Sequence, residues 1–445
     1  MNKASNPIIK PAEFKKRRKQ LLKAIGKGSA AILPAAPQLI RNNDAEYAYR
    51  QESSFYYLTG FNEPEAVLVL IPGRQNEYVL FCRDRDPAME IWTGKRSGQE
   101  GVVAEYGVDE AFSISDIDQE LPGLLEGVRS VHTAIGQDAD FDQQLFSWVN
   151  QLRQQGRRGK QAPVEFIDLG LLLNEMRLFK SRSEISAMRR AAKISADAHM
   201  HAMRHTRAGA MEYEIQAETE CCFRKSGCVP SYSSIVGGGE NACVLHYVDN
   251  TSELNDGELL LMDAGAEFEL YAADITRTWP INGKFNEQQK ILYTIVLNAQ
   301  LAAIKQVRPG KSWNAAHKAA ARVITKGLIG AGLLKGQVDK LIKAEAYKKF
   351  FMHGTGHWLG MDVHDVGQYK INGKWRPLEP GMVLTVEPGL YIPPGTKGVA
   401  KKWWNIGIRI EDDVLVTEDG CDVLTKGVVK DIDAIETLVG SAYKL

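Results

Sequence analysis

Short apolar runs separated by turn residues dominate the first third of the chain. Runs of this length that end in Gly, Pro or Asp are typical of buried β-strands. They are SAAILPAA (29–36), EAVLVLIPG (65–73), EYVLFCRD (77–84) and SVHTAIG (130–136). DFDQQLFSWVNQLRQQ (140–155) instead repeats its apolar residues at helical spacing. This mixture predicts an α/β domain over residues 1–176, with a surface loop at 154–163.

A long helical pattern marks the start of a second domain. Residues 180–205, KSRSEISAMRRAAKISADAHMHAMRH, place Ile185 and Ala192 on one face, and Ser183 is a suitable N-cap. Further helices and apolar strands follow as far as residue 445. We therefore expect a second domain over residues 177–445.

Composition and the N-terminal segment bear on partners and location. Lys+Arg and Asp+Glu each total 55, and a neutral chain has no electrostatic footprint for nucleic acid. No stretch approaches the roughly 18 apolar residues of a membrane span, and the N-terminus lacks the apolar segment of a secretory signal. The basic run Lys15–Lys19 lies beside Phe14 and Leu21 at helical spacing, so we expect its charges on the exposed face of an amphipathic helix. The six cysteines form no CxxC pair and are predicted to be reduced thiols of a cytoplasmic protein.

Carboxylates inside apolar strands are the most unusual feature of the second domain. Asp263 lies in LLLMDAGAEF, Asp274 in YAADITRTW and Glu387 in MVLTVEPGLY. Burying an unpaired carboxylate is costly, so such groups are paired, neutralised or bound to metal. A structural ion pair would explain one of them. Three in one domain, with histidines nearby, predict a functional site.

Pairing of strands would bring two of these acids together. Asp263 and Asp274 lie eleven residues apart, and a hairpin centred on residues 268–269 would place them directly opposite each other. Side chains in that position have Cβ atoms about 4.5–5.5 Å apart, close enough to share a cation or to bridge two. Glu387 precedes Pro388, which favours an extended backbone, as at the end of a strand.

The segment WNIGIRIEDDVLV (404–416) alternates between its two faces. Ile406 and Ile408 occupy one face, and Arg409 and Glu411 share the other. By itself, such a charged face is more typical of solvent exposure than of a site.

Histidines supply the other candidate ligands. FMHGTGHWLGMDVHDVG contains His353, His357 and His364. The first two are four residues apart, but two intervening glycines favour a loop over the helix of an HExxH zinc site. His246 taken alone is more typical of a structural core histidine.

These donors predict a metal site rich in carboxylates, with imidazole and without thiolate. Such ligands suit Mn²⁺, Co²⁺, Fe²⁺ or Zn²⁺. Four carboxylates are too many for one catalytic zinc ion but suit two divalent ions about 3.5–4 Å apart. A pair of that kind acidifies a bridging water and holds a substrate carbonyl, so the predicted chemistry is hydrolysis.

The pattern resembles the pita-bread metallopeptidases, a group that includes methionine aminopeptidases, prolidases and aminopeptidases P. The ligand order that carries this resemblance is Asp263, Asp274, His357, Glu387 and Glu411. The resemblance implies an α/β N-terminal domain, residues 1–176, followed by an α+β pita-bread (creatinase/aminopeptidase-like) catalytic domain, residues 177–445. In such a domain two related halves each lay helices over a curved antiparallel sheet, and the metals lie between them.

Longer motifs resemble the Xaa-Pro aminopeptidase (aminopeptidase P) branch of this group. They are HGTGHWLGMDVHD, SIVGGGENACVLHY, VEPGLYIP and, in the first domain, RNNDAEYAYRQESSFYYLTGFNEPEAVLVLIPG. The implied reaction is hydrolysis of the bond between an N-terminal residue and a following proline. Prolidase, which is restricted to Xaa-Pro dipeptides, stays open as an alternative. So does a non-catalytic peptide-binding module on the same fold, although such relatives typically lose metal ligands.

The resemblance also implies a role for each site residue. Asp263, Asp274 and Glu411 would hold one divalent ion, and His357 and Glu387 would complete the site of a second, with Mn²⁺ the expected metal and Co²⁺, Zn²⁺ or Fe²⁺ as alternatives. Asp274 and Glu411 would bridge the two ions. Glu387 would also be the acid/base that acts on the metal-bridging hydroxide.

Substrate contacts and oligomer contacts complete the expected site. The residues expected to orient the substrate, assist catalysis or line the cleft are His246, His364, His353, Arg409 and Tyr391. Trp92, in EIWTGKRSG, resembles a residue that reaches the active site of a neighbouring subunit, which implies a homo-oligomer, a dimer or tetramer. The first domain would serve oligomerisation and substrate restriction. The expected partners are peptides with proline in second position, with no nucleic acid and no membrane.

Overall fold

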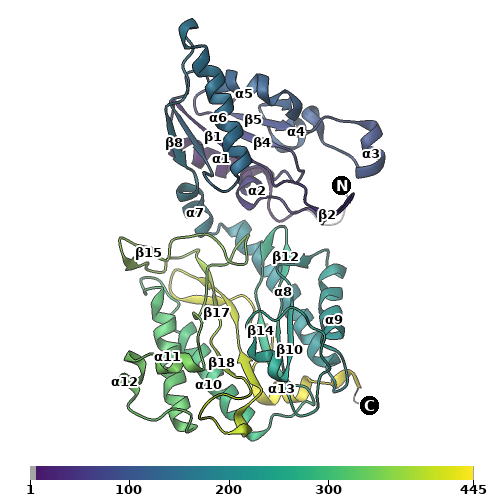
Figure 1. Ribbon diagram of the computed structural model, residues 1–445, viewed down its shortest axis with the longest axis vertical. Helices are drawn as coiled ribbons and strands as arrows, with labels where there is room; N and C mark the ends of the chain where they lie inside the picture. Colours follow the sequence, from purple (N-terminus) through teal and green to yellow (C-terminus); the bar gives the residue numbers. More distant parts are fainter. Residues whose placement is uncertain (1–6, 444–445) are drawn as a thin grey trace. The chain divides into compact units, whose positions relative to one another are not determined.

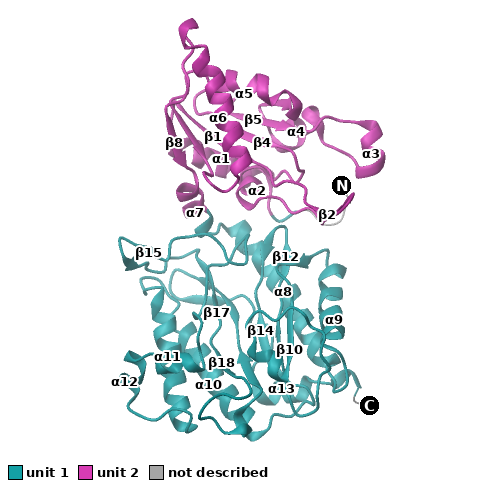
Figure 2. Cartoon of the chain, viewed as in Figure 1, with its two compact units in different colours: residues 1–8, 177–445 teal, residues 9–176 magenta. Residues whose placement is uncertain are grey.

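The computed structural model describes residues 7–443. They form two compact units, one of residues 9–176 and the other of residues 177–443 with residues 7 and 8 (Figure 2). No helix in this described range is long and apolar enough to cross a bilayer.

A six-stranded mixed sheet lies at the centre of the first unit (Figure 1). In sheet order its strands are β6 (Glu110–Ser113), β5 (Tyr78–Cys82), β4 (Val67–Leu70), β1 (Ser29–Pro34), β7 (Ser130–Thr133) and β8 (Glu165–Asp168). The four strands predicted from apolar runs are confirmed. The pattern does not predict β6 and β8, because these edge strands are only partly buried and carry few apolar residues.

Helices flank this sheet. They are α1 (Pro11–Ile25), α2 (Ser53–Thr59), α3 (Pro87–Thr93), α4 (Gly98–Tyr106), α5 (Ile117–Leu125) and α6 (Ala139–Gln154), with a hairpin of β2 (Ile40–Asn42) and β3 (Ala45–Glu46) and a following α7 (Gly170–Leu178). The exposed basic face predicted for α1 is wrong for Arg17 and Arg18, which are 2% and 5% exposed. Their guanidinium groups donate to the Tyr57 and Leu58 carbonyls. They also lie 4.0 Å from the centroids of the Tyr57 and Tyr78 rings, so cation–π contacts stabilise their burial.

The second unit consists of two halves of similar construction, with helix pairs on the outer sides and strands between them (Figure 1). The first half contains α8 (Arg182–His205), α9 (Glu212–Lys225), β9 (Val229–Pro230), β10 (Ile235–Gly238), β11 (Leu259–Asp263), β12 (Ala266–Phe268), β13 (Tyr271–Ala272) and β14 (Thr276–Pro280). The second half contains α10 (Glu287–Ile304), α11 (Asn314–Gly330), α12 (Val338–Lys343), β15 (Lys370–Ile371), β16 (Lys374–Trp375), β17 (Val383–Val386), β18 (Gly389–Ile392), β19 (Ile406–Arg409), β20 (Asp412–Val416) and β21 (Cys421–Val423), followed by α13 (Ile432–Leu438). One continuous apolar core runs through both halves.

The start of α8 is fixed by a capping box. The Ser181 hydroxyl accepts from the Glu184 amide, and the Glu184 carboxylate accepts from the Ser181 amide. The prediction of Ser183 as N-cap is therefore wrong by two residues. Ser181 has a Glu three positions later, which satisfies two amides reciprocally.

The hairpin expected between the two aspartates is present, but in a different register. Its tip lies at Glu269 and Leu270, with φ of 48° and 62°, so both residues adopt the left-handed conformation favoured in tight hairpin turns. Asp263 pairs with Thr276, and the prediction that it lies directly opposite Asp274 is wrong. Because side chains alternate along a strand, Asp274 lies on the same face as Thr276 and is a diagonal neighbour of Asp263.

Candidate metal centre

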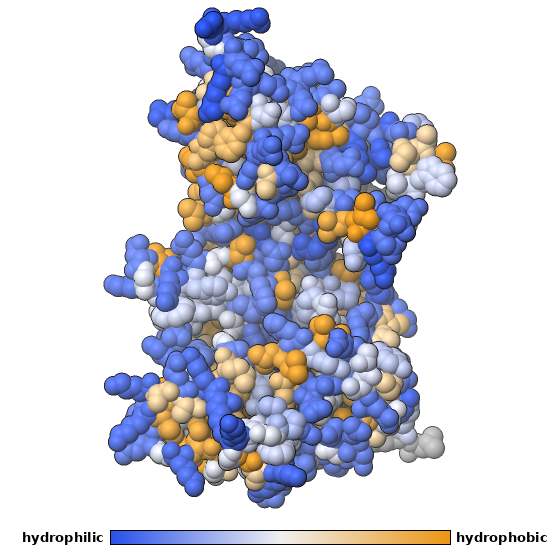
Figure 3. All heavy atoms as spheres, viewed as in Figure 1, coloured by the Kyte–Doolittle hydropathy of each residue, from blue (hydrophilic) through white to orange (hydrophobic). Residues whose placement is uncertain are grey.

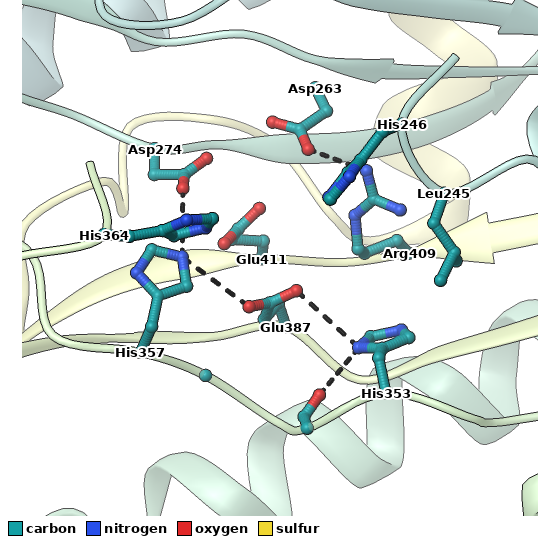
Figure 4. A pocket seen from close by; sticks show the side chains of 12 residues that line it. Leu245, His246, Asp263, Asp274, His353, His357, His364, Glu387, Arg409 and Glu411 are labelled. Atoms are coloured by element: carbon teal, nitrogen blue, oxygen red, sulfur yellow. Dashed lines mark hydrogen bonds and ion pairs between the residues drawn. The ribbon is translucent and has the colours of Figure 1, made fainter. Parts of the chain in front are cut away.

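One pocket in the second unit gathers the predicted acids and imidazoles (Figure 4). Its volume is about 190 Å³, and its lining includes His246, Asp263, Asp274, His353, His357, His364, Glu387, Arg409 and Glu411. Tyr391 is fully buried beside the pocket. Trp92 belongs to the first unit, where its side chain is 84% exposed.

The first half supplies two acids. Asp263 ends β11, and Asp274 precedes β14; they are 8% and 5% exposed. The Tyr232 hydroxyl lies 2.5 Å from a carboxylate oxygen of each. The two acids are therefore held within reach of one shared group.

The second half supplies Arg409, which ends β19, and Glu411, which precedes β20. They are 4% and 2% exposed, so the expectation of a solvated face is wrong, because the first half covers this face. Thr276 Oγ1 donates to Glu411 at 2.6 Å, and Arg409 Nε donates to Thr276 Oγ1 at 3.0 Å. Arg409 Nη2 also donates to Asp263 at 2.7 Å, which joins the two halves across the pocket.

His357 lies in an irregular loop, as its flanking glycines predict. Its Nε2 is 3.3 Å from Asp274 and 3.7 Å from Glu387. Its Nδ1 lies 2.9 Å from the Trp358 carbonyl, a contact that orients the ring and leaves Nε2 facing the acids. Gly356 allows the close approach of this loop to β17, because a Cβ there would lie 2.0 Å from the Thr385 carbonyl oxygen.

A chain of polar contacts leads from the acids to His353. Arg409 Nη1 donates to the Tyr391 hydroxyl at 3.1 Å, and this hydroxyl lies 2.8 Å from His353 Nε2. His353 Nδ1 is 3.8 Å from Glu387. Burial, with the charge of Arg409, lowers the pKa of His353 to about 3, so the imidazole is neutral at physiological pH.

The acids repel one another strongly in this setting. Burial and the charge of Asp274 raise the pKa of Asp263 to about 6, and burial raises that of Glu387 to about 7. The pKa of Glu411 is raised well above its usual range for the same reasons. Burial opposes a charge on His357, but its hydrogen bond with Asp274 and the charges of Asp274 and Glu387 raise its pKa to about 9. A cluster of this kind favours a cation.

The donor set fits divalent metal. Asp274, His357 and Glu411 each offer a ligand atom, and these atoms lie within 4.8 Å of one another. Within the described part of the chain, no other group of three or more His, Cys, Asp or Glu residues meets this criterion. Asp263 and Glu387 lie in the same pocket, so these five donors are four carboxylates and one imidazole. These are hard oxygen donors with nitrogen, suited to Mn²⁺, Co²⁺, Fe²⁺ or Zn²⁺.

Two histidines lie at the open side of the pocket. His246 and His364 are exposed, and the His364 ring lies edge-on to that of His357 with centroids 4.3 Å apart. The interpretation of His246 as a core histidine is therefore wrong. Both imidazoles are positioned to meet a ligand that enters from solvent.

The sequence interpretation missed two residues of this site. Tyr232 contacts both aspartates, and Thr276 contacts both Arg409 and Glu411. Neither residue type signals a site by itself. Thr276 was within reach of pattern reasoning, because it lies two residues after Asp274 on the same strand face.

Comparison with known proteins agrees with this geometry. Residues 186–418 match metallopeptidase family M24, and residues 14–132 match the aminopeptidase P N-terminal domain. Xaa-Pro aminopeptidase of Escherichia coli (strain K12) is 48% identical over 98% of this chain and 99% of its own length. Pseudomonas aeruginosa aminopeptidase PepP is 55% identical, with a TM-score of 0.97 over 98% of this chain and 99% of that one. Aminopeptidase P from E. coli with the inhibitor Pro-Leu is 47% identical, with a TM-score of 0.95 over 98% of this chain and 100% of that one. The chain therefore belongs to metallopeptidase family M24 and, within it, to the Xaa-Pro aminopeptidases.

Proposed function

We propose that this chain removes the N-terminal residue from peptides with proline in second position, using two divalent ions. The observation that carries the proposal is the convergence of three buried carboxylates, the partly buried Glu387 and His357 on one pocket. The relative from E. coli bound to Pro-Leu, a dipeptide that begins with proline, supports the specificity.

The five donors divide between two ions. Asp263, Asp274 and Glu411 would hold one, and His357 and Glu387 the other, with Asp274 and Glu411 shared. Mn²⁺ is the metal we expect, because most of the donors are hard oxygens. When bound, such a pair supplies Lewis acidity, which lowers the pKa of water and polarises the scissile carbonyl.

The chain's own groups move the proton and orient the substrate. Glu387 would accept the proton and deliver it to the prolyl nitrogen. His246 and His364, exposed at the pocket, would hydrogen-bond the substrate and its tetrahedral intermediate. His353 and Arg409, which line the pocket beside Glu387, would contact the substrate and help to orient it.

Specificity would come from both ends of the scissile bond. A prolyl nitrogen carries no N–H, so proteases that bind that group are poorly matched to it. The neutral His353 ring, which lines the pocket and packs against the buried Tyr391 ring with centroids 5.5 Å apart, would offer a flat surface to a proline ring. The free amine would be held at the acidic side of the pocket.

We infer that the first unit mediates a homo-oligomer, a dimer or tetramer, in the cytoplasm. Ile91 and Trp92 of α3 are 82% and 84% exposed, and Figure 3 shows apolar atoms over this helix. Exposed apolar side chains in one helix are typical of an interaction surface. Trp92 would complete the active site of a neighbouring subunit and restrict its substrates.

A peptide panel tests the proposed function. Xaa-Pro dipeptides, Xaa-Pro-Yaa tripeptides, longer Xaa-Pro peptides and Xaa-Ala controls are compared after exhaustive removal of metal and after addition of Mn²⁺. We expect cleavage of tripeptides and longer chains only with proline in second position and only with metal. Cleavage confined to dipeptides would indicate a prolidase, and full activity without metal, verified by elemental analysis, would refute the proposal.

A further inference from the structure

A second, larger cavity adjoins the metal pocket within the same unit. Its volume is about 530 Å³, against about 190 Å³ for the metal pocket. His353, Gly354 and Gly356 line both. The loop that carries these residues therefore separates the two spaces and is the place where they meet.

The floor of this cavity is tied to the catalytic loop. His317, in the first turns of α11, has Nδ1 2.9 Å from Thr355 Oγ1 and Nε2 3.3 Å from the Tyr347 hydroxyl. The Thr355 carbonyl in turn accepts from the Glu387 amide at 2.9 Å. Hydrogen bonds therefore link the lining of this cavity to the segment that positions Glu387.

Two glycines lie at the junction of the cavities, and packing requires glycine at only one of them. Gly356 is required by packing, because a Cβ there would lie 2.0 Å from the Thr385 carbonyl oxygen. At Gly354 the nearest atom to an added Cβ is the Gly356 carbonyl oxygen at 3.9 Å, and its φ lies outside the left-handed region. Neither backbone conformation nor packing requires glycine at this exposed position. Its effect is that no side chain stands between the two spaces.

The walls of the second cavity suit apolar side chains. Trp313, Tyr347 and Trp375 contribute their rings, and Trp375 is 40% exposed. Lys348 and Glu345 lie at the same cavity, but Lys348 Nζ pairs with the Glu345 carboxylate at 2.7 Å. Because these two charges neutralise each other, the aromatic rings and the ammonium group of Lys318, which also lines the cavity, are the main groups offered to a ligand.

We propose that this cavity binds the residues that follow proline in longer peptide substrates, with preference for aromatic or large apolar side chains. The inference rests on the proposed function, and the lining that the two cavities share at His353, Gly354 and Gly356 gives the route by which the peptide would pass from one to the other. The metal pocket is smaller than the roughly 300–1,000 Å³ of typical ligand sites, so it holds the reacting groups. The second cavity lies within that range.

The test compares two substrates, Ala-Pro-Phe-Phe and Ala-Pro-Gly-Gly, by kcat/KM with the metal-loaded full chain. We expect the wild type to favour the first by about tenfold or more, the discrimination typical of an apolar pocket. Trp375→Ala, which removes one wall, and Gly354→Val, which fills the junction, should both bring the ratio close to one. Tyr213→Ala, an exposed aromatic on α9 that lines neither cavity, should keep the wild-type ratio.

Three outcomes would overturn the inference. They are a wild-type ratio near one, a ratio unchanged by Trp375→Ala, and an equal loss of the ratio in Tyr213→Ala. Trp375→Ala decides the matter even if Gly354→Val does not fold. A change in Ala-Pro-Gly-Gly cleavage on adding free Phe-Phe amide, without preference between the linked substrates, would mean that the cavity binds a separate ligand, which also contradicts the proposal. Failure of the proposed function is distinguishable, since neither substrate would then be cleaved.

Discussion

Asp365, which follows His364 directly, lies in a buried network of charges. Its two oxygens accept from Arg177 Nη2 at 2.7 Å and from Lys180 Nζ at 3.0 Å. Arg177 also pairs with Asp362 at 2.6 Å. The side chains of Asp365 and Lys180 are 1% exposed and that of Arg177 is 3% exposed. This network holds the loop of His364 against residues 177–180, with which the second unit begins.

Replacing Asp365 by Ala would leave Lys180 without its carboxylate partner in a buried place. Removing one partner of a buried ion pair typically costs about 3–5 kcal/mol. For a domain of about this size, 1 kcal/mol shifts the melting temperature by roughly 2–4 °C, so we expect a fall of roughly 6–20 °C. The measurement is differential scanning calorimetry of the metal-loaded protein. We expect kcat to fall as well, because the His364 loop loses its anchor.

A matched control separates burial from charge. Lys193 Nζ and Asp197 also pair at 2.7 Å, but their side chains are 64% and 67% exposed. Asp197→Ala should therefore change stability by less than about 1 kcal/mol. A second variant, Lys180→Met with Asp365→Ala, should recover part of the loss, because no unpaired ammonium group then stays buried. Equal shifts for Asp365→Ala and Asp197→Ala would refute the reasoning.

Other predictions follow from the site and the core. Glu387→Ala should lower kcat by at least about 10²-fold through loss of the proton acceptor; retention of a tenth of the wild-type rate at saturating metal would mean that another acid has this role. His357→Ala should lose bound metal by elemental analysis, whereas His364→Ala and His246→Ala should keep two ions and lose about 10²–10³-fold in kcat; metal loss in His364→Ala would contradict these roles. His199 is fully buried, with Nε2 3.0 Å from the Ala264 carbonyl oxygen, and burial lowers its pKa to about 3. Below about pH 6.5 this histidine binds a proton in the unfolded chain but not in the folded one. The free energy of unfolding therefore falls as the pH drops below about 6.5, and at pH 5 the loss due to His199 is about 2 kcal/mol. His199→Gln should show a smaller drop in melting temperature between pH 7 and pH 5, and identical drops would contradict this origin.

The sequence predicts best where one physical rule acts alone. Apolar runs bounded by turn residues locate β1, β4, β5 and β7. These strands are buried on both faces, so nearly all their residues are apolar and the run itself marks the strand. Acids in apolar strands and clustered histidines point to residues that the structure places in one pocket. Both features follow from the high cost of burying charge.

Prediction from sequence fails where tertiary contacts determine the burial of a side chain or the register of a hairpin. Arg17 and Arg18 are buried because Tyr57 and Tyr78 lie over the helix, which periodicity does not encode. The hairpin register depends on two left-handed residues, Glu269 and Leu270, neither of which is a typical turn former. Tyr232 reaches the aspartates from a distant segment, so no spacing rule finds it.

The contacts that join the two halves impose an order on folding during synthesis. Asp263 gains its guanidinium partner only when Arg409 is present, 146 residues later, and Thr276 meets Glu411 135 residues later. Until then a nascent chain carries aspartates that have no cationic partner from the second half and cannot be buried cheaply. We therefore expect the first half to reach its native packing late, after most of the chain has left the ribosome. Contacts between residues so far apart in the sequence favour slow folding. Until they form, the strands of the first half stay exposed, and these are the segments that we expect chaperones to protect.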